Sequence, residues 1–289
     1  MLAHSQPRAP RPASDRRQAA KTSALVLELY GGFVRRLGGR IAIAHMIQLL
    51  ADLGVDETVV RAAVARLVRS GLLRRAPSNG SRSPNYELTE PAAAILAEGD
   101  RRLFERRPPA DVRDGWVLVV FSIPEHQRHL RHVLRVRLTR LGFGNTAPGV
   151  WLAPRWLLDD ARGLVQRLGL NSFVQLYVAD YRGDGDMHAL VARAWDVGAL
   201  HRLYADFVRD RAPLLERLRR AATIEPRAAF VEYMQVQSQW RGLPLLDPGL
   251  PPEFLPADWA GAAAADLFFA LREVLDPPAV DHVRGVTRS

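Results

Sequence analysis

The sequence predicts an α+β protein of several domains: an N-terminal winged helix-turn-helix, a ferredoxin-like βαββαβ middle domain and a mainly helical C-terminal domain. Three observations predict it. The 289 residues are enough for two or three domains with sizeable cores. Residues 53–75, LGVDETVVRAAVARLVRSGLLRR, have the pattern of a short turn, a helix and the start of a hairpin. Residues 115–182 then alternate between strand and helix patterns.

Changes in composition set the expected boundaries. Proline, alanine and arginine without apolar periodicity mark the N-terminal end, and a charged, proline-bearing segment follows the first domain. The expected parts are a disordered basic tail (1–22), a winged helix (23–90), a linker helix and linker (91–114), a ferredoxin-like domain (115–182) and a helical C-terminal domain (187–289).

The helix at the centre of the first domain has recognisable ends. Gly54 closes a preceding helix, expected over residues 41–53, and Asp56 is in position to cap the next helix with its side chain. Val55 and Val60 are spaced as a hydrophobic staple, and Gly71 follows the last turn. A further amphipathic helix over residues 23–37 completes the expected three-helix scaffold.

This central helix has two faces when its residues are placed at about 100° each. The apolar face contains Val59, Val60, Ala63, Val64, Leu67 and Val68. The opposite face contains Thr58, Arg61, Ala62, Ala65, Arg66 and Arg69. Small residues between arginines suit close approach to the DNA major groove, where arginine binds guanine through two hydrogen bonds. The alternative interpretation is an ordinary arginine-rich surface helix.

The hairpin after this helix is expected to form the wing. Strands over residues 72–75 and 85–88 bracket the turn-forming stretch APSNGSRSP. Asn79 and Arg82 lie at its tip, where they are expected to contact the backbone or the minor groove of DNA.

The charge of the chain is concentrated near these elements. The formal net charge is +9, and residues 1–114 hold 19 Lys and Arg against 12 Asp and Glu, a net of +7. A basic domain beside a nearly neutral remainder indicates a polyanionic partner. Lys21 is the only lysine, so base composition is a second explanation for the arginines, though not for their location.

Composition also excludes several classes. The absence of cysteine removes disulfides, thiolate zinc sites and cysteine nucleophiles. No apolar run is long enough to span a membrane and no secretory signal is recognisable, so we expect a cytoplasmic protein. No cofactor, metal site or catalytic residue is predicted.

The remaining chain is assigned by hydrophobic periodicity. The βαββαβ pattern follows from strands over 116–123, 142–145, 149–152 and 173–181, with helices over 125–141 and 156–168. The C-terminal part is expected to contain helices over 187–219, 228–240 and 258–275, an extended segment over 243–256, and a frayed end after residue 277.

Three stretches carry a family resemblance: LADLGVDETVVRAAVARLVRSGLLRR, GWVLVVFSIPEHQRHLRHVLRVRLTRLGFGNTAPGVWLAPR and WRGLPLLDPGLPPEFLPADW. The chain resembles the PaaX family, the bacterial repressors of phenylacetate catabolism. The resemblance implies a homodimer that represses transcription by occluding a promoter at an imperfect inverted repeat of double-stranded DNA. It also implies release by phenylacetyl-coenzyme A or another aromatic acyl-coenzyme A.

The resemblance raises an enzymatic alternative as well. The middle region of the family is similar to the small CRISPR-associated ferredoxin-like nuclease, which uses an aspartate at the end of its first strand to help hold a metal. Ser122 and Ile123 stand at that place here, and Asp180 at the end of the last strand has no partner carboxylates in the pattern. A single carboxylate is a poor magnesium site, so we expect no enzyme.

An acyl-coenzyme A site needs cations for the phosphates and an apolar slot for the acyl group. Arg227, Trp240 and Arg241 are the candidate effector-binding residues. The family commonly has a histidine and an acid just before its aromatic–arginine pair, whereas this chain has Ser238 and Gln239. The effector therefore stays open, and Trp240 and Arg241 could instead fix the proline-rich segment in place.

One further pattern lies in the helix expected over 125–141. Five arginines alternate with leucines there, as a second DNA contact or as a solvated or dimer-flanking face. His126, His129 and His132 recur every third residue and read as surface histidines rather than a metal site, because no other ligands are nearby.

Overall fold

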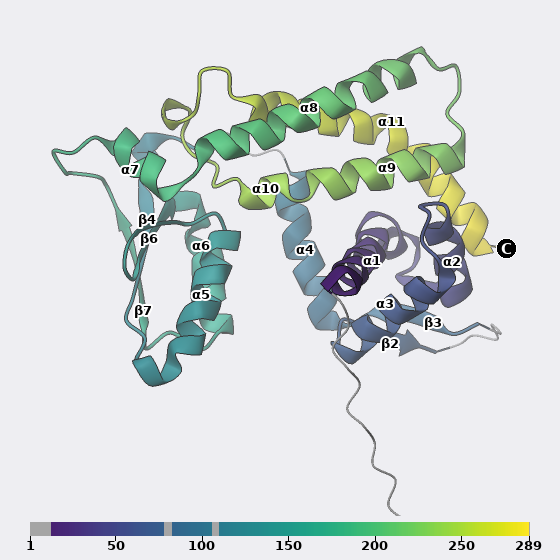
Figure 1. Ribbon diagram of the computed structural model, residues 1–289, viewed down its shortest axis with the longest axis horizontal. Helices are drawn as coiled ribbons and strands as arrows, with labels where there is room; N and C mark the ends of the chain where they lie inside the picture. The colour runs from purple at the N-terminus through teal and green to yellow at the C-terminus, as the bar shows by residue number, and fades with distance from the viewer. Residues whose placement is uncertain (1–12, 78–82, 106–109, 289) are drawn as a thin grey trace, which may run out of the picture. The chain divides into compact units, whose positions relative to one another are not determined.

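The computed structural model describes residues 13–77, 83–105 and 110–288, which form helices and two small sheets (Figure 1). The chain divides into two compact units. The first unit comprises residues 1–100, 221–238 and 272–289, and the second comprises residues 101–220 and 239–271. The expected C-terminal segment, 187–289, therefore contributes to both units. None of the described helices is long and apolar enough to cross a membrane.

The first unit is built on three helices and a three-stranded sheet. Helix α3 packs against α1, α2 and β2, and Figure 1 shows it beside the hairpin. The fully buried side chains at its centre include Leu29, Met46 and Val60. The element bounds are α1 (Ala13–Gly32), β1 (Arg40–Ala42), α2 (Ile43–Ala51), α3 (Glu57–Arg69), β2 (Leu73–Ala76), β3 (Asn85–Leu88) and α4 (Glu90–Phe104).

Helix α3 begins and ends where the sequence predicts. Gly54 and Gly71 both adopt positive φ, at 75° and 72°, a conformation that costs glycine little and other residues more. The expected cap by the Asp56 side chain is wrong, because that side chain accepts no hydrogen bond from the helix. The Asp56 carbonyl instead accepts from the backbone N–H groups of Val59 and Val60.

The apolar face of α3 is mostly as predicted. Val60, Ala63, Val64 and Leu67 are buried. Burying each of the larger side chains contributes roughly 1.5–3 kcal/mol relative to exposure. Val68 is 38% exposed, because it lies at the edge of this face rather than in it.

The small sheet has one strand more than the predicted hairpin. The strand order is β1-β3-β2, and both pairings are antiparallel. Residues 40–42 form β1, although Ile41 and Ala42 were expected to begin a helix, and Ile41 pairs with Tyr86. Ile41 and Ala42 are buried in this position, so tertiary packing outweighs local helix preference.

Helix α1 corrects the expected disordered tail. The helix begins at Ala13, inside the segment 1–22 that we expected to lack structure. Thr22 and Val26 are fully buried, and Arg66 of α3 donates hydrogen bonds to the Ala19 carbonyl at 3.0 Å and the Ser23 hydroxyl at 3.1 Å. These contacts with α3 stabilise a helix that the polar sequence alone does not predict.

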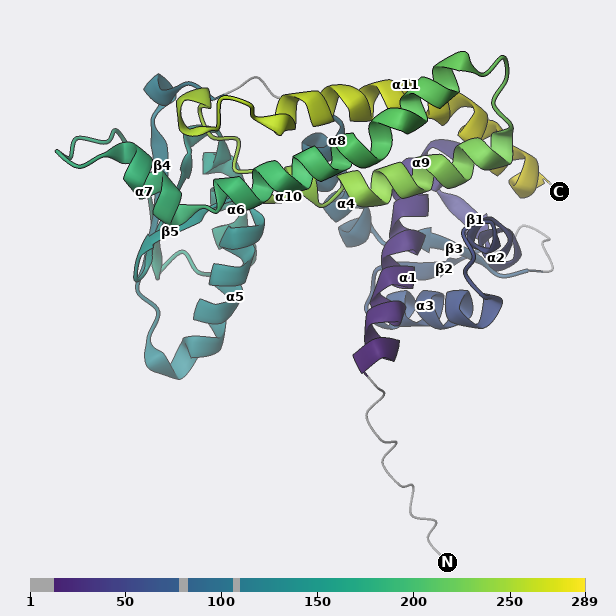
Figure 2. The same cartoon turned by 45° about the horizontal axis from the view of Figure 1, so that its top comes forward.

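The second unit contains a four-stranded sheet of order β5-β6-β4-β7, antiparallel throughout. With its helices it follows the predicted βαββαβ order. Figure 2 shows α5 and α6 on the same side of this sheet, where Val117, Val119, Leu134 and Leu164 form one core. The bounds are β4 (Trp116–Phe121), α5 (Arg128–Arg140), β5 (Gly144–Ala147), β6 (Val150–Pro154), α6 (Leu158–Arg167) and β7 (Val174–Ala179).

Helices from the C-terminal part complete the two units. A second core joins the sheet residues Trp116 and Leu152 to Val191 and Leu250. In the second unit, α8 and the first part of α11 run side by side in both views (Figures 1 and 2). The bounds are α7 (Met187–Ala194), α8 (Val197–Arg220), α9 (Pro226–Trp240), α10 (Leu243–Leu246) and α11 (Ala260–Arg288).

Three C-terminal expectations need correction. The helix expected over 187–219 is broken at Trp195, which is extended and donates its indole N–H to the Gly142 carbonyl at 2.8 Å. The segment 243–256 is not wholly extended, since it contains α10 and a short 3-10 turn. The final helix continues through Pro277 and Pro278 to Arg288, because Ala279 and Val283 are fully buried.

Candidate nucleic-acid interface

The polar face of α3 is open to solvent. Thr58, Arg61, Ala62, Ala65 and Arg69 are all exposed, opposite the buried valines. The Arg61 guanidinium forms an ion pair with Glu57 one turn earlier, at 2.7 Å, with more than half of each side chain exposed. Such an exposed pair is weak, at about 0.3–0.5 kcal/mol, so Arg61 can exchange Glu57 for another anion at small cost.

Arg66 differs from the other two arginines of this face. It is only half-buried, and its guanidinium is held by α1 through the Ala19 carbonyl and the Ser23 hydroxyl. The structure therefore gives Arg66 a packing role that the helical-wheel pattern does not reveal. Arg61 and Arg69 keep accessible guanidinium groups.

The hairpin places further cations beside α3. Glu87 of β3 accepts from Arg40 at 3.0 Å and from Arg74 at 2.8 Å, so one carboxylate serves two arginines. Arg75 of β2 is exposed. Asn79 and Arg82, expected at the hairpin tip, lie outside the described residues.

The turn that joins α2 to α3 is tied to C-terminal residues of the same unit. The Asp52 carboxylate accepts a 2.6 Å hydrogen bond from Nε of Arg227 and lies 2.7 Å from Nε2 of His282. Its side chain is only 12% exposed. Nothing in the sequence signals this cluster, because Asp52 lies 175 positions from Arg227 and 230 positions from His282. We call Asp52, Arg227 and His282 the turn cluster.

Two further contacts hold α9 and the end of α11 against the first helices. Arg36 forms a two-pronged ion pair with Asp276, at 2.8 and 2.7 Å, which raises the pKa of Arg36. The Phe33 ring packs on Phe230 and Tyr233, with ring centroids 5.5 and 5.3 Å apart. The helices that support α3 therefore share their core with C-terminal segments of the same unit.

Glu225 orders the start of α9 beside the turn cluster. Its carboxylate accepts from the backbone N–H groups of Arg227 and Ala228, at 2.9 and 2.6 Å. These hydrogen bonds lower the pKa of Glu225, the one from Arg227 most strongly. The carboxylate occupies the position favoured for an anion at a helix N-terminus.

The three expected effector residues fall in different compact units. Arg227 belongs to the first unit, whereas Trp240 and Arg241 belong to the second. Trp240 is 4% exposed, donates to the Leu103 carbonyl at 3.0 Å and stacks on Phe268 at 4.6 Å.

Gln239 accepts a 2.6 Å hydrogen bond from Arg211. This side chain is therefore engaged within the second unit rather than turned to a ligand. The contact links α8 to the end of α9.

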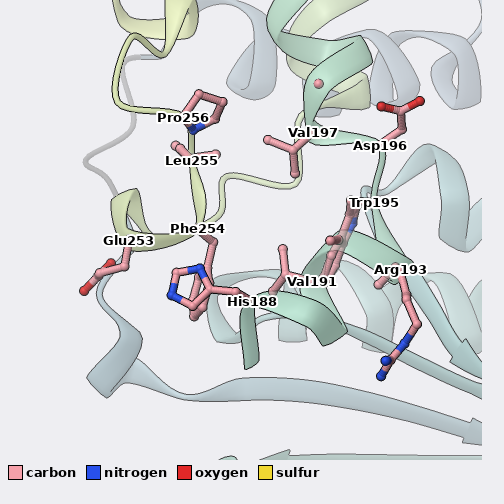
Figure 3. A pocket seen from close by; sticks show the side chains of 13 residues that line it. His188, Val191, Arg193, Trp195, Asp196, Val197, Glu253, Phe254, Leu255 and Pro256 are labelled. Atoms are coloured by element: carbon pink, nitrogen blue, oxygen red, sulfur yellow. The ribbon is translucent and has the colours of Figure 1, made fainter. Parts of the chain in front are cut away.

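The second unit contains a cleft that the sequence does not signal. It has a volume of about 630 Å³ and lies between α7 and the segment that follows Leu250 (Figure 3). The His188 ring packs beside Phe254, with centroids 5.0 Å apart, and Val191 and Trp195 add apolar surface. Arg193 and Asp196 also line the cleft, and Figure 3 shows their side chains pointing away from each other.

The residues relevant to nuclease chemistry are placed separately. Ser122 follows β4 and is exposed, and Asp180 follows β7 and pairs with Arg182 at 3.3 Å. His126, His129 and His132 are all exposed. Within the described part of the chain, no group of three His, Cys, Asp or Glu side chains is arranged to hold a metal ion.

These features define a modular protein in which a helix–turn–helix and a hairpin precede a βαββαβ sheet and C-terminal helices. Comparison with family models agrees with that order. Residues 21–92 match the PaaX-like protein model, residues 109–191 the PaaX protein central Cas2-like domain, and residues 195–285 the PaaX-like protein C-terminal domain. The chain belongs to the PaaX family.

Two individual proteins are similar over most of the chain. The transcriptional repressor PaaX of Escherichia coli strain K12 is 28% identical over 265 residues, which cover 90% of this chain and 82% of that protein. The solved structure of the uncharacterized protein Rv0674 from Mycobacterium tuberculosis is similar in fold, with a TM-score of 0.57 and 23% identity. The match covers 91% of this chain and 98% of that one.

Proposed function

We propose that this protein is a sequence-specific DNA-binding transcriptional repressor whose N-terminal elements act as a winged helix. The observation that carries the proposal is the open face of α3, where Arg61 and Arg69 flank the small exposed residues Ala62 and Ala65. Small side chains let the helix backbone lie deep in the major groove, and the arginines then reach guanine edges.

Membership of the PaaX family supports the regulatory part of this proposal. The similar protein from Escherichia coli is a transcriptional repressor, and its match includes the residues that form α3 and the hairpin. Repression follows if the bound protein occludes a promoter.

We propose further that the protein acts as a homodimer on an imperfect inverted repeat. Two α3 helices related by a twofold axis would enter successive major grooves about one helical turn apart. Thr58, Arg61, Ala62, Ala65 and Arg69 would face the bases, while Arg66 supports the helix from the side of α1. Asn79 and Arg82 of the hairpin tip would touch the DNA backbone or the minor groove.

The proposed signal is an aromatic acyl-coenzyme A produced during catabolism of phenylacetate or a similar compound. Such a ligand needs an apolar slot and cations for its phosphates. Because Trp240 is enclosed by other aromatic rings, the cleft beside Val191, Trp195 and Phe254 suits the acyl group better. Arg193 lies at the same cleft and would supply positive charge. Arg241 of the same unit remains a candidate for the phosphates.

A titration of DNA binding tests the central proposal. The full chain is titrated with its own promoter duplex and with a random duplex, and then compared with Arg61→Ala and Arg69→Ala. We expect a loss of about 1–3 kcal/mol on the promoter for an arginine that reads a base, with a much smaller loss on the random duplex. Arg209→Ala is the matched control, because Arg209 is exposed but paired with Asp206 and Asp210 in the second unit. Equal losses of affinity on both duplexes would show that Arg61 or Arg69 contacts a phosphate rather than a base.

A further inference from the structure

Helix α5 of the second unit carries positive charge without negative charge. Its thirteen residues, RHLRHVLRVRLTR, include five arginines and no acid, and it has no acidic residue in its first turn. Leu134 and Leu138 are buried against the sheet, which leaves the charged side chains toward solvent.

The arginines of its first two turns lie along one stripe. At about 100° per residue, Arg128, Arg131 and Arg135 fall within about 60° of one another, and His132 adjoins them. Arg128, His132 and Arg135 are exposed, and Arg131 is half-buried. We call these four residues the α5 basic stripe. Arg131 contacts Glu125 at 3.1 Å and the Ile123 carbonyl at 2.8 Å. Arg128 and Arg135 have no carboxylate partner within the described residues.

This arrangement differs from the other arginine-rich helix of the same unit. On α8, Arg209 pairs with Asp206 and Asp210, and Glu216 pairs with Arg219 and Arg220. Alternating signs of this kind are typical of a solvated face, because opposite charges one turn apart stabilise a helix. Arg128 and Arg135 of the α5 basic stripe lack that compensation within the described residues, although both helices come from the same arginine-biased sequence.

The position of the stripe in the helix adds a second argument. Arg128 and Arg131 lie in the first turn of α5, where the helix dipole is positive and a cation is unfavourable. An anion bound at this place would interact favourably with the positive end of the helix dipole and would reduce the repulsion between the arginines. The stripe from Arg128 to Arg135 extends about 10 Å along the helix, a length that spans about three phosphates of one DNA strand.

We propose that the α5 basic stripe is a second DNA-binding surface, which contacts the phosphate backbone of duplex DNA independently of sequence. Its role is to add electrostatic affinity outside the bases read by α3. The choice of DNA as the partner rests on the proposed function, but the surface lies on a different helix in a different unit. The contribution is therefore expected to be the same on specific and random duplexes.

The test is the salt dependence of binding to a random duplex, measured with the full chain. Each phosphate contact contributes about 0.9 to the slope of log K against log salt concentration. The double variant Arg128→Gln with Arg135→Gln should therefore reduce the slope by about 1.8 for each protomer that contacts the duplex, and by the same amount on the promoter duplex. Arg162→Gln with Arg209→Gln is the control, because it removes the same charge from exposed arginines that already have carboxylate partners. Its slope should stay close to that of the unchanged protein.

Three outcomes overturn the inference. The first is an equal change of slope in both double variants, which would reduce the effect to net charge. The second is an unchanged slope in the Arg128 and Arg135 variant. The third is a change of oligomeric mass in that variant without a change of slope, which would assign the stripe to a protein contact. Failure of the α3 proposal is recognised separately, because Arg69→Ala would then leave promoter affinity unaltered whatever the α5 variants do.

Discussion

Arg66 and Arg69 lie one turn apart on α3, and the structure gives them different surroundings. Arg66 donates two hydrogen bonds to α1, whereas Arg69 is exposed and has no ion pair within the described residues. The two side chains lie on the same face of the helical wheel, but they have different physical roles. Their separate roles can be measured without DNA.

We predict that Arg66→Ala lowers the free energy of unfolding by about 1–2 kcal/mol, because each lost hydrogen bond is worth about 0.5–1.5 kcal/mol. Arg69→Ala should change that free energy by less than about 0.5 kcal/mol, as is usual for an exposed residue. Urea unfolding of both variants checks the difference. Equal stability of the two variants would mean that the α1 contacts of Arg66 contribute nothing in solution.

Tyr204 of α8 predicts an alkaline limit to stability. Burial is the largest cause that raises the pKa of Tyr204 well above its usual value. The nearby Asp247 carboxylate, which accepts a 2.9 Å hydrogen bond from the Tyr204 hydroxyl, raises the pKa further. A raised folded-state pKa means that the folded chain holds the proton more tightly than the unfolded chain. The resulting stability is fully present below about pH 10, the pKa of an unfolded tyrosine, and is lost as the pH rises toward the folded-state pKa.

Tyr204→Phe should therefore weaken the loss of stability above about pH 10, while lowering stability at neutral pH through the lost hydrogen bond. The measurement is the free energy of unfolding as a function of pH. Tyr177→Phe is the control, because Tyr177 is 54% exposed. If both variants show the same alkaline dependence as the unchanged chain, Tyr204 does not titrate in the way proposed.

The turn between α2 and α3 is the element through which C-terminal residues reach the proposed DNA-binding helix. Asp52 ends α2, and its partners Arg227 and His282 come from α9 and α11 of the same unit. A shift of either helix would move Asp52 and thereby the start of α3. The turn cluster is thus a physical link between the C-terminal helices and the open face.

We predict that Asp52→Ala lowers the free energy of unfolding by about 1–2 kcal/mol, somewhat less than a buried charged hydrogen bond because Arg227 is 62% exposed. His282→Ala should cost more than Arg227→Ala, since the His282 side chain is only 16% exposed. Unfolding and promoter binding are measured on the three variants. A stable Asp52→Ala protein with unchanged affinity would show that the turn cluster does not position α3.

Local patterns accounted for the elements that carry most of the fold. The two-faced pattern of α3, the hairpin strands and the βαββαβ order all follow from periodicity and turn residues. The strand at 40–42 was missed because its pairing with Tyr86 depends on residues far along the chain. The continuation of α11 past Pro277 and Pro278 was missed for the same reason, because buried contacts outweigh two poor helix formers.

The sequence likewise predicted part of the candidate site. The exposed positions of Thr58, Arg61, Ala62, Ala65 and Arg69 follow from the wheel of α3. The anchoring of Arg66 does not, because one partner, Ala19, lies in the segment expected to be disordered and the other, Ser23, was expected only to begin a helix. The cleft beside His188 and Phe254 also left no sequence signal, since its walls come from segments more than fifty residues apart.

At the scale of the whole molecule, two C-terminal segments belong to the same compact unit as the N-terminal helices. Residues 221–238 and 272–289 belong to the same compact unit as α1, α2 and α3. Ala279 and Val283 of α11 are fully buried, so these segments contribute to the stability of that unit rather than forming an independent C-terminal body. A change in these two C-terminal segments would therefore act on α3 within one unit.

The central claim is that the protein recognises a particular DNA sequence through α3, and selection of bound duplexes from fragmented genomic DNA tests it most directly. We predict enrichment of a small number of sites that share an imperfect inverted repeat, with half-sites about 10 base pairs apart from centre to centre. The same selection with Arg61→Ala and Arg69→Ala should lose the enrichment at positions within the half-sites. Bound fragments that match the input DNA at moderate salt, with no shared sequence, would contradict the account.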